Sequence, residues 1–183
     1  RPDWRALEVF SGNALWQGVL LKDILDEAGV QAGATQVVSR SIDGWTAGTP
    51  TEVIMDGRDA LLAIAMNGEP LPARNGYPVR MVVPGLYGYV SATKWLEEIR
   101  LTTLEDEDGY WIPKGWAKEA PVKTQSRIDV PRRRDILVAG PIPVAGVAWA
   151  PSRGIAKVEV RIDDGDATGE WREAELGRVA SDD

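Results

Sequence analysis

The sequence contains no cysteine and no histidine among its 183 residues. Disulfide bonds are therefore excluded. The chain also cannot build a His/Cys metal site, a cysteine nucleophile or a histidine general base from its own side chains. These absences exclude most hydrolase and zinc chemistries, and they leave carboxylates, amines, guanidinium groups and hydroxyls to act unless a bound cofactor carries the reaction.

The chain also lacks a net positive charge and long apolar runs. The formal net charge is -7, which argues against nucleic acid as the main partner because such proteins need a basic face. No stretch approaches the roughly 18 consecutive apolar residues that a membrane-spanning helix needs. No signal peptide is visible and the chain opens at Arg1 rather than Met, so we expect a piece of a longer protein.

The composition that is present, 44% hydrophobic and 27% charged, is typical of a soluble globular protein. A chain of this length predicts one domain or two small ones. Helical and strand patterns alternate through residues 1–103, residues 104–135 are polar and loop-like, and residues 136–183 have strand character. We interpret these regions as a domain, a surface connector and a second domain.

Local patterns predict a helix over 19–29, a strand over 36–41, a helix over 56–66 and a strand over 78–83. Gly29 is a suitable end for the first helix. Asp56 is expected to cap the second helix, and Asn67 and Gly68 are expected to close it with a turn. Pro84 ends the second strand. The first domain is therefore predicted to be of the α+β class.

The last region is predicted to be part of a β-sandwich. Residues 157–163 alternate strictly, so that Val158, Val160 and Ile162 would face a core. Residues 163–166 carry a hairpin turn signal. Further strands are expected over 140–149 and between Trp171 and Leu176. Few strands are present before the sequence stops, which predicts an incomplete sandwich.

The most informative segment is residues 75–95, where two cations flank a turn. Arg80 lies on the strand face opposite to most of its apolar residues, and its planar fork matches a phosphate group. Lys94 adds a second charge. A helix is expected to begin near Ser91, and its free N–H groups, at Ser91, Ala92 and Thr93, would attract an anion. The segment predicts a phosphate clamp; by pattern alone, structural ion pairs are the more common role for such cations.

The sequences NGYPVR at 75–80 and VVPGLYGYVSATKW at 82–95 resemble the molybdopterin-binding domain of the sulfite oxidase family. Residues 12–19 and 66–72 agree with the same family, and the closest likeness is to YedY-like and actinobacterial membrane-linked members. Segments at 146–149, 155–164 and 171–176 resemble its immunoglobulin-like dimerisation domain. The resemblance implies a molybdopterin domain over 1–103, a connector over 104–135 and a partial immunoglobulin-like domain over 136–183.

By this resemblance, Asn75 and Arg80 match residues that contact the pterin or its phosphate, with Asn75 standing where many members carry histidine. Lys94 matches a basic contact beside them, and Ser91, Ala92 and Thr93 match the backbone segment that cradles the cofactor. Ser41 falls near a hydroxyl position that touches the cofactor in YedY-like proteins. The implied cofactor is molybdopterin with molybdenum.

One departure concerns the metal. The family binds molybdenum through a single cysteine set before the first short helix, whereas the matching stretch here, residues 4–11, has none. Valine and phenylalanine at Val9 and Phe10 offer a metal no donor. Either a loop is missing between Val9 and Ser11, or the ligand has been lost, so cofactor occupancy in this chain is open at this point.

Two functions follow from the resemblance. The first is an oxidoreductase that transfers an oxygen atom, as in sulfite oxidation or sulfoxide reduction. It would act on a small oxyanion or sulfoxide, pass electrons to a partner, form a homodimer, and lie outside the cytoplasm or at a membrane in its full-length form. The second is a non-catalytic scaffold or dimerisation module without metal. Trp111 and Trp116 are candidates to border the pocket, and residues 132–134 form either a solvated basic loop or a cationic rim.

Overall fold

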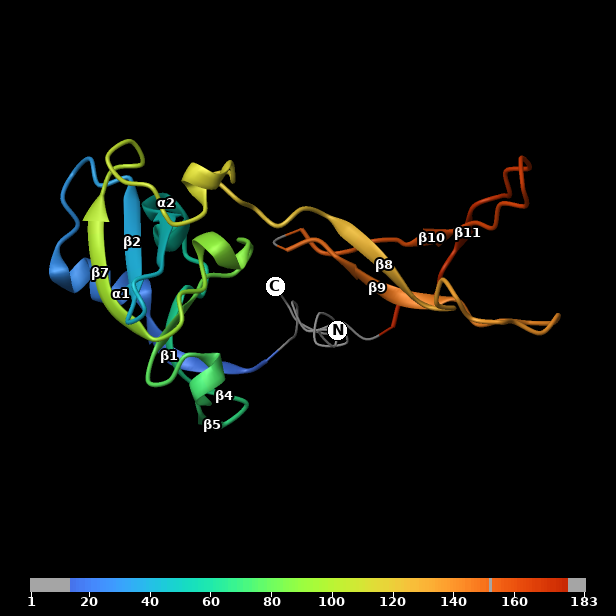
Figure 1. Cartoon of the computed structure of the whole chain (residues 1–183), viewed down its shortest axis with the longest axis horizontal. Coiled ribbons are helices and arrows are strands. Elements are labelled where there is room, and N and C mark those ends of the chain that lie inside the picture. The colour runs from blue at the N-terminus through green and yellow to red at the C-terminus, as the bar shows by residue number, and fades with distance from the viewer. Residues whose placement is uncertain (1–13, 152, 178–183) are drawn as a thin grey trace. The chain divides into compact units, whose positions relative to one another are not determined.

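The computed structural model describes residues 14–151 and 153–177, and the chain divides after Pro121 into two compact units. Figure 1 shows the elements of each unit, which are described separately below. Within the described residues, no helix has the length and apolar character needed to cross a membrane.

A three-stranded antiparallel sheet forms the centre of the first unit. Its order is β3 (Thr46–Pro50), β2 (Gln36–Ser41) and β7 (Leu96–Thr102), so β2 is bonded on both edges. Val37 and Val38 of β2 are 0% and 1% exposed, which shows that the strand is covered on both faces. The strand predicted over 36–41 is therefore confirmed with the same bounds.

A second antiparallel sheet is built around β4 (Leu61–Met66). The strand β1 (Trp16–Leu20) pairs along one edge, while β5 (Glu69–Pro70) and β6 (Arg80–Val82) share the other. The strand predicted over 78–83 is confirmed in its centre. Because β6 is short, Arg80 stands at its first position, opposite Ala63.

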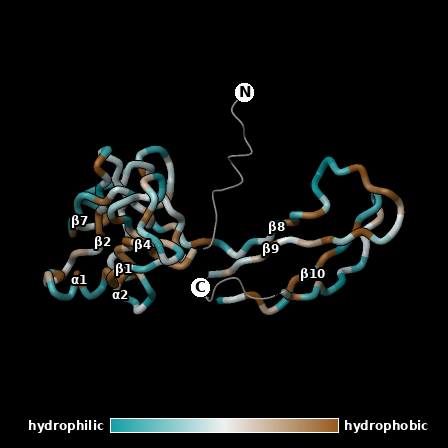
Figure 2. The backbone as a smooth tube through the Cα atoms, turned by 90° about the horizontal axis from the view of Figure 1, so that it is seen from below, coloured by the Kyte–Doolittle hydropathy of each residue, from teal (hydrophilic) through white to brown (hydrophobic). Residues whose placement is uncertain are grey.

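Two short helices pack on the core of the first unit, α1 (Leu21–Ala28) and α2 (Thr51–Met55). Their hydrophobic residues can be followed in Figure 2. Each buried side chain of leucine size contributes roughly 1.5–3 kcal/mol. The core is formed by Leu21, Leu25, Val37, Ile54, Ala60, Met81 and Val83.

The first predicted helix is confirmed but begins later than expected. Its start moves to Leu21 because Val19 and Leu20 pair with Leu62 and Leu61 of β4. Gly29 ends the helix as predicted, with φ of 79° and an N–H that donates to the oxygen of Leu25.

The helix predicted over 56–66 is wrong. Residues 61–66 form β4, and Asp56 follows α2 and binds Arg58 instead of capping a helix. The run of leucine and alanine favours a helix locally, but pairing with β1 and β6 satisfies its backbone groups from both sides. The turn at Asn67 and Gly68 is confirmed, as the link from β4 to β5.

The helix expected to begin near Ser91 is also absent from the described structure. A single 3₁₀ turn spans Gly88–Val90, and Ser91 follows it with φ of -143°. The chain then enters β7 through Trp95, whose φ is 49°. The N–H groups of Ser91 and Ala92 donate to the oxygen of Gly88 at 3.3 and 3.0 Å, so they are not free to bind an anion. The expected helix-terminus contribution to the clamp is therefore wrong.

The second unit contains two small antiparallel pairs. The strand β8 (Gln125–Val130) pairs with β9 (Ala145–Trp149), and β10 (Glu159–Val160) pairs with β11 (Arg172–Glu173). The strand expected over 140–149 is confirmed in part, and the turn at 163–166 is confirmed by bonds between Asp164 and Ala167. Strand 157–163 is reduced to two residues, and Ile162, expected in a core, is 75% exposed.

The expected connector, residues 104–135, is divided between the two units. Residues 104–121 pack within the first unit, where Tyr110 N donates to Thr46 O at 3.0 Å and Tyr87 N to Ala120 O at 2.8 Å. Residues 125–130 form β8. Both halves are held by backbone hydrogen bonds. A polar sequence with several prolines gives no sign of such bonds.

Candidate functional site

Three segments meet at the candidate site: the turn over 73–77, the start of β6, and residues 93–96 that lead into β7. Trp95 joins them, because its indole Nε1 donates to Ala73 O at 2.7 Å and its backbone N–H donates to Gly76 O at 3.3 Å. Leu96 N donates to Val79 O at 2.9 Å. These bonds bring Asn75, Arg80 and Lys94 together, here called the cationic cluster.

Arg80 is the most unusual member of this cluster. Its Nη1 donates to the backbone oxygen of Asn75 at 3.1 Å, and its guanidinium lies 4.9 Å from the ring centroid of Trp16. Its Nε is buried without a hydrogen-bond partner, and the same holds for Oδ1 of Asn75. Burial lowers the pKa of Arg80 below its ordinary value, with no carboxylate among the described residues to oppose the shift.

Gly76 packs between the first side-chain carbons of the two cationic residues. Its φ is 108°, and a Cβ at this position would lie 2.9 Å from Lys94 Cβ and 3.0 Å from Arg80 Cβ. A side chain there would push both cationic residues apart. Lys94 Nζ donates to Arg74 O at 3.1 Å and lies 4.9 Å from the Trp95 ring.

The segment over 91–93 supports the cluster from behind. Ser91 Oγ donates to the oxygens of Leu86 and Tyr87 at 3.3 and 3.0 Å. Thr93 Oγ1 lies 2.7 Å from Ser39 Oγ, and both residues are 0% exposed. The hydroxyls of Ser91 and Thr93 are thus engaged within the protein, and only Ala92 of this segment reaches a cavity wall.

A cavity of about 360 Å³ opens beside Lys94, here called the aromatic cavity. It is a concave site with several aromatic walls and few polar groups, which is typical of a cofactor site. It is lined by Ser41, Asp43, Trp45, Gly88, Tyr89, Ala92, Lys94, Trp95 and Trp111. Lys94 belongs to both features and therefore links the cationic cluster to the aromatic cavity.

Asp43 is a cavity residue that sequence reasoning missed. The hydrogen bond from the Trp45 N–H to Asp43 Oδ1, at 3.1 Å, is the main cause that lowers the pKa of Asp43, and the nearby Ser41 hydroxyl and Lys94 act in the same direction. Ser41 Oγ is itself buried and makes no hydrogen bond of ordinary geometry within the described residues. Asp43 and Gly44 lie in the turn between β2 and β3, and only the tertiary fold places Asp43 in the same cavity wall as Lys94.

Of the other candidate residues, only Trp111 lines the aromatic cavity. Trp111 lines the cavity, while Trp116 is 49% exposed and stacks edge-on against Tyr89 at 4.7 Å. Arg40, on the neighbouring strand β2, is paired with Glu97 and Glu98 on the sheet and does not line the cavity. Residues 132–134 belong to the second unit and are exposed, in agreement with a solvated loop.

The expected metal-binding stretch, residues 4–11, lies outside the described residues. Among residues 14–151 and 153–177, no group of three or more acidic, histidine or cysteine side chains is arranged to hold a metal ion. The described site is therefore a cationic and aromatic one, suited to a phosphorylated planar molecule.

The chain is similar in sequence to known oxidoreductases. Residues 4–111 match the family described as "Oxidoreductase molybdopterin binding domain". The chain is 41% identical over 102 residues to the uncharacterized oxidoreductase YuiH of Bacillus subtilis, covering 56% of this chain and 50% of that protein. It is 32% identical over 191 residues to human mitochondrial sulfite oxidase, covering 89% of this chain and 34% of that protein.

A solved structure agrees with the sequence relatives. The sulfane dehydrogenase SoxCD of Paracoccus pantotrophus matches 91% of this chain and 45% of its own chain, with a TM-score of 0.71 and 28% identity. The chain thus spans between a third and a half of the length of these relatives. The shared fold extends beyond the residues that the family description matches.

Proposed function

The chain belongs to the molybdopterin-binding oxidoreductases of the sulfite oxidase family, and from this premise we propose that its first unit holds molybdopterin for an oxygen-atom transfer reaction. The substrate in this proposal is a small oxyanion or a sulfoxide. The cationic cluster and the aromatic cavity are the parts of the chain that act on the cofactor.

The observation that carries the proposal is the pair of unsatisfied atoms in the cationic cluster. Arg80 Nε and Asn75 Oδ1 are buried without partners, and a buried polar group left unpaired costs about 1–3 kcal/mol. Such a cost is expected where a ligand supplies the missing partners. A donor beside an acceptor suits a ligand that carries both phosphate oxygens and N–H groups.

The residues present fit molybdopterin in both of its parts. Arg80 and Lys94 would hold the phosphate, since neither forms a salt bridge with a carboxylate among the described residues; Lys94 interacts with Asp43 only through longer-range electrostatics. Asn75 would pair with a nearby donor of the ligand. The aromatic cavity next to Lys94 would receive the planar ring system, where the ionised carboxylate of Asp43 accepts N–H groups.

When bound, the cofactor supplies the metal centre that carries the transferred oxygen atom and the electrons. The described residues orient this group and surround it. Trp45, Trp95 and Trp111 reduce the access of water to the cavity, which strengthens the electrostatic contacts inside it. Ser39 and Thr93 hold the wall segment that carries Ala92 and Lys94 in place.

The finer organisation is also part of the proposal. We assign residues 1–103 to the cofactor domain and residues 136–183 to a partial immunoglobulin-like dimerisation domain, with the connector over 104–135 contributing to both units. The relatives support this, because human sulfite oxidase matches 89% of the chain and SoxCD 91%. A homodimer, an electron-accepting partner and a location outside the cytoplasm or at a membrane belong to the full-length protein in this proposal.

A second function is favoured by one feature of the sequence. The 183 residues contain no cysteine, so they supply no thiolate to molybdenum. A chain with an intact pterin site but no thiolate would hold the cofactor without the family's metal ligation. It would then serve as a scaffold or dimerisation module.

Cofactor content separates the two functions. The chain is expressed in a host that makes the molybdenum cofactor, and its pterin and molybdenum contents are measured by pterin fluorescence and by mass spectrometry. Pterin with an equimolar amount of molybdenum supports the enzyme, and pterin without molybdenum supports the scaffold. Absence of both, in a folded protein, overturns the proposed cofactor site.

A further inference from the structure

Residues 103–111 follow β7 and end at the wall of the aromatic cavity; they are here called the strap. The strap is acidic and carries Glu105, Asp106, Glu107 and Asp108. An acidic sequence of this kind is typical of a solvated loop. In this protein, however, specific contacts hold the strap on the first unit as far as Trp111.

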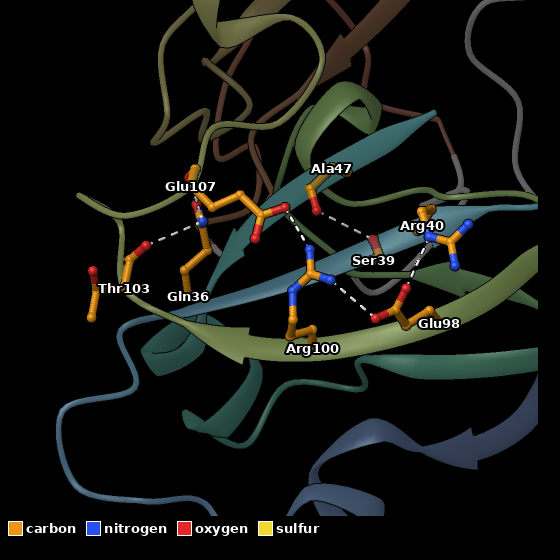
Figure 3. Close-up of polar contacts among 8 residues, drawn as sticks. All are labelled: Gln36, Ser39, Arg40, Ala47, Glu98, Arg100, Thr103 and Glu107. Atoms are coloured by element: carbon orange, nitrogen blue, oxygen red, sulfur yellow. Dashed lines mark hydrogen bonds and ion pairs between the residues drawn. The ribbon is translucent and has the colours of Figure 1, made fainter. Parts of the chain in front are cut away.

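Gln36 is the principal anchor of the strap. It is 2% exposed, and its side-chain Nε2 donates to the backbone oxygen of Glu107 at 2.8 Å and to that of Thr103 at 3.4 Å. Figure 3 shows both bonds converging on one amide group. A buried amide that serves two carbonyl groups fixes both of them, because leaving either unpaired in the interior is costly.

An ion-pair chain holds the same point from outside. The Glu107 carboxylate accepts from Arg100 at 2.6 Å, and Arg100 also donates to Glu98 at 3.0 Å, which in turn binds Arg40 (Figure 3). These side chains are partly exposed, so each pair contributes little and is screened by salt. The buried contact of Gln36 is therefore the stronger of the two anchors.

Two glycines allow the strap to lie directly on β3. A Cβ on Gly109 would lie 2.9 Å from Gly48 N, and a Cβ on Gly48 would lie 2.3 Å from Gln36 Oε1. Only residues without side chains permit this close approach. Tyr110 N then donates to Thr46 O at 3.0 Å, and the next residue is Trp111 in the cavity wall.

We propose that Gln36 is a positioning residue, which sets the place of Trp111 in the wall of the aromatic cavity by anchoring the strap through Thr103 and Glu107. Trp111 in turn limits the size and polarity of the molecule that the cavity accepts. The identity of that molecule rests on the proposed function, whereas the anchoring of Trp111 does not.

The anchoring is tested by ¹⁹F NMR on the chain labelled with 5-fluorotryptophan, with the Trp111 resonance assigned from a Trp111→Phe variant. Gln36→Leu removes the donor while keeping a buried side chain. Gly109→Ala leaves the Gln36 side chain unchanged but pushes the strap away from the backbone of Gly48 and Ala47 on β3. Both are expected to shift or broaden the Trp111 resonance and to leave that of Trp171, in the second unit, unchanged.

Thr49→Val is the matched control, because Thr49 is also a fully buried polar residue, of the neighbouring strand β3, and its hydroxyl donates to Val90 O and not to a carbonyl group of the strap. It should leave the Trp111 resonance in place. An unmoved Trp111 resonance in Gln36→Leu would overturn the proposal, and so would an equal movement in Thr49→Val. If Gln36→Leu does not fold, Gln36→Met takes its place, and an unmoved Trp111 resonance in that variant overturns the proposal.

A second measurement links the anchor to the ligand. In protein from a cofactor-producing host, Gln36→Leu is expected to lower pterin retention roughly three- to tenfold, as for the loss of a single hydrogen bond. If the unaltered chain retains no pterin, the proposed function fails but the resonance test stands. If pterin retention is unchanged while Trp111 moves, the anchoring holds and the role of Trp111 in ligand selection is refuted.

Discussion

Arg80 donates from Nη1 to the backbone oxygen of Asn75 at 3.1 Å, while Arg80 Nε and the Asn75 side-chain oxygen remain buried and unpaired beside this bond. This backbone bond and the Trp16 ring, 4.9 Å from the guanidinium, hold Arg80 in place and leave its Nε unpaired. Burial without a counter-charge disfavours the charged form, and it lowers the pKa of Arg80. In the proposed site, an anion would compensate for this cost in stability.

Arg80→Met should therefore separate binding from stability. In cofactor-loaded protein, pterin content should fall about tenfold or more, because charge-assisted hydrogen bonds contribute roughly 1.5–3 kcal/mol. In the free protein, the unfolding free energy should stay the same or rise, since an uncompensated cation is removed. Chemical denaturation and pterin fluorescence measure the two quantities.

The matched control is Arg40→Met. Arg40 is paired with Glu97 and Glu98 and does not line the cavity. It should retain pterin at the level of the unaltered chain. A large loss of stability in free Arg80→Met would show that Arg80 is a structural residue and would contradict its assignment to the phosphate.

Gly76→Ala tests whether the backbone at this point determines the spacing of the cations. The alanine would be strained by the backbone φ of 108°, and its Cβ would lie only 2.9 Å from Lys94 Cβ and 3.0 Å from Arg80 Cβ. Gly115→Ala is its control, because Gly115 has φ of 90° but nothing within 4 Å of the new Cβ. Both should lose about 1–3 kcal/mol through backbone strain.

The difference between these two variants isolates the steric effect. Gly76→Ala should lose about 1–3 kcal/mol more, the usual cost of overpacking, and it alone should lower pterin retention. Thermal unfolding of the two proteins gives the comparison. Equal losses would mean that the region around Gly76 yields easily, and the close packing of the two cations would then carry no functional weight.

The Ser39 and Thr93 hydroxyls form a pair that a double-mutant cycle can measure. Each is 0% exposed, and their oxygens are 2.7 Å apart. Ser39→Ala strands the buried Thr93 hydroxyl and should cost about 1–3 kcal/mol, whereas in Thr93→Val the Ser39 hydroxyl keeps its 3.4 Å hydrogen bond to Ala47 O and the loss should be smaller. The double variant should cost less than the sum, with a coupling of about 0.5–3 kcal/mol.

A functional consequence accompanies that coupling. Thr93 precedes Lys94, and its backbone oxygen accepts from Met81 N at 2.8 Å, so movement of Thr93 displaces Lys94 relative to β6. Pterin retention should fall in Thr93→Val and be largely preserved in Thr93→Ser. Additive stability losses together with normal retention in Thr93→Val would contradict this view.

The sequence revealed those features that depend on nearby residues. The helix that ends at Gly29, the strand over 36–41 with its two valines, and the turn at Asn67 and Gly68 depend on local signals, and each is present in the structure. The helix prediction for residues 61–66 was wrong because hydrogen bonds to β1 and β6, which lie far away in the sequence, outweigh the local helix propensity.

The candidate site likewise combines residues that the sequence identifies with residues that only the tertiary fold brings to the site. Family resemblance named Asn75, Arg80 and Lys94, and the structure brings them together, although it removes the helix expected near Ser91. The cavity residues Asp43 and Tyr89 carry no local signal of function. Their position depends on how β2, β3 and the segment over 88–95 pack, which only the tertiary structure contains.

Acidification tests the ion-pair chain that ends at the strap. The hydrogen bond from Arg40 is the main cause that lowers the pKa of Glu98 below its ordinary value of 4.5. Because its folded-state pKa is depressed, Glu98 stabilises the fold above about pH 4.5, and this contribution is lost as the pH falls through the lower, folded-state value. Glu98→Gln should therefore be less stable than the unaltered chain at pH 7, and the gap should close in acid.

Urea denaturation of both proteins between neutral and acidic pH measures this gap. Since Glu98 and its partners are partly exposed, about 1 M salt should reduce the gap at pH 7 as well. A gap that stays constant with pH would mean that the charge of Glu98 is irrelevant to stability. It would also leave Gln36, and not the ion pairs, as the contact that holds residue 107 on the sheet.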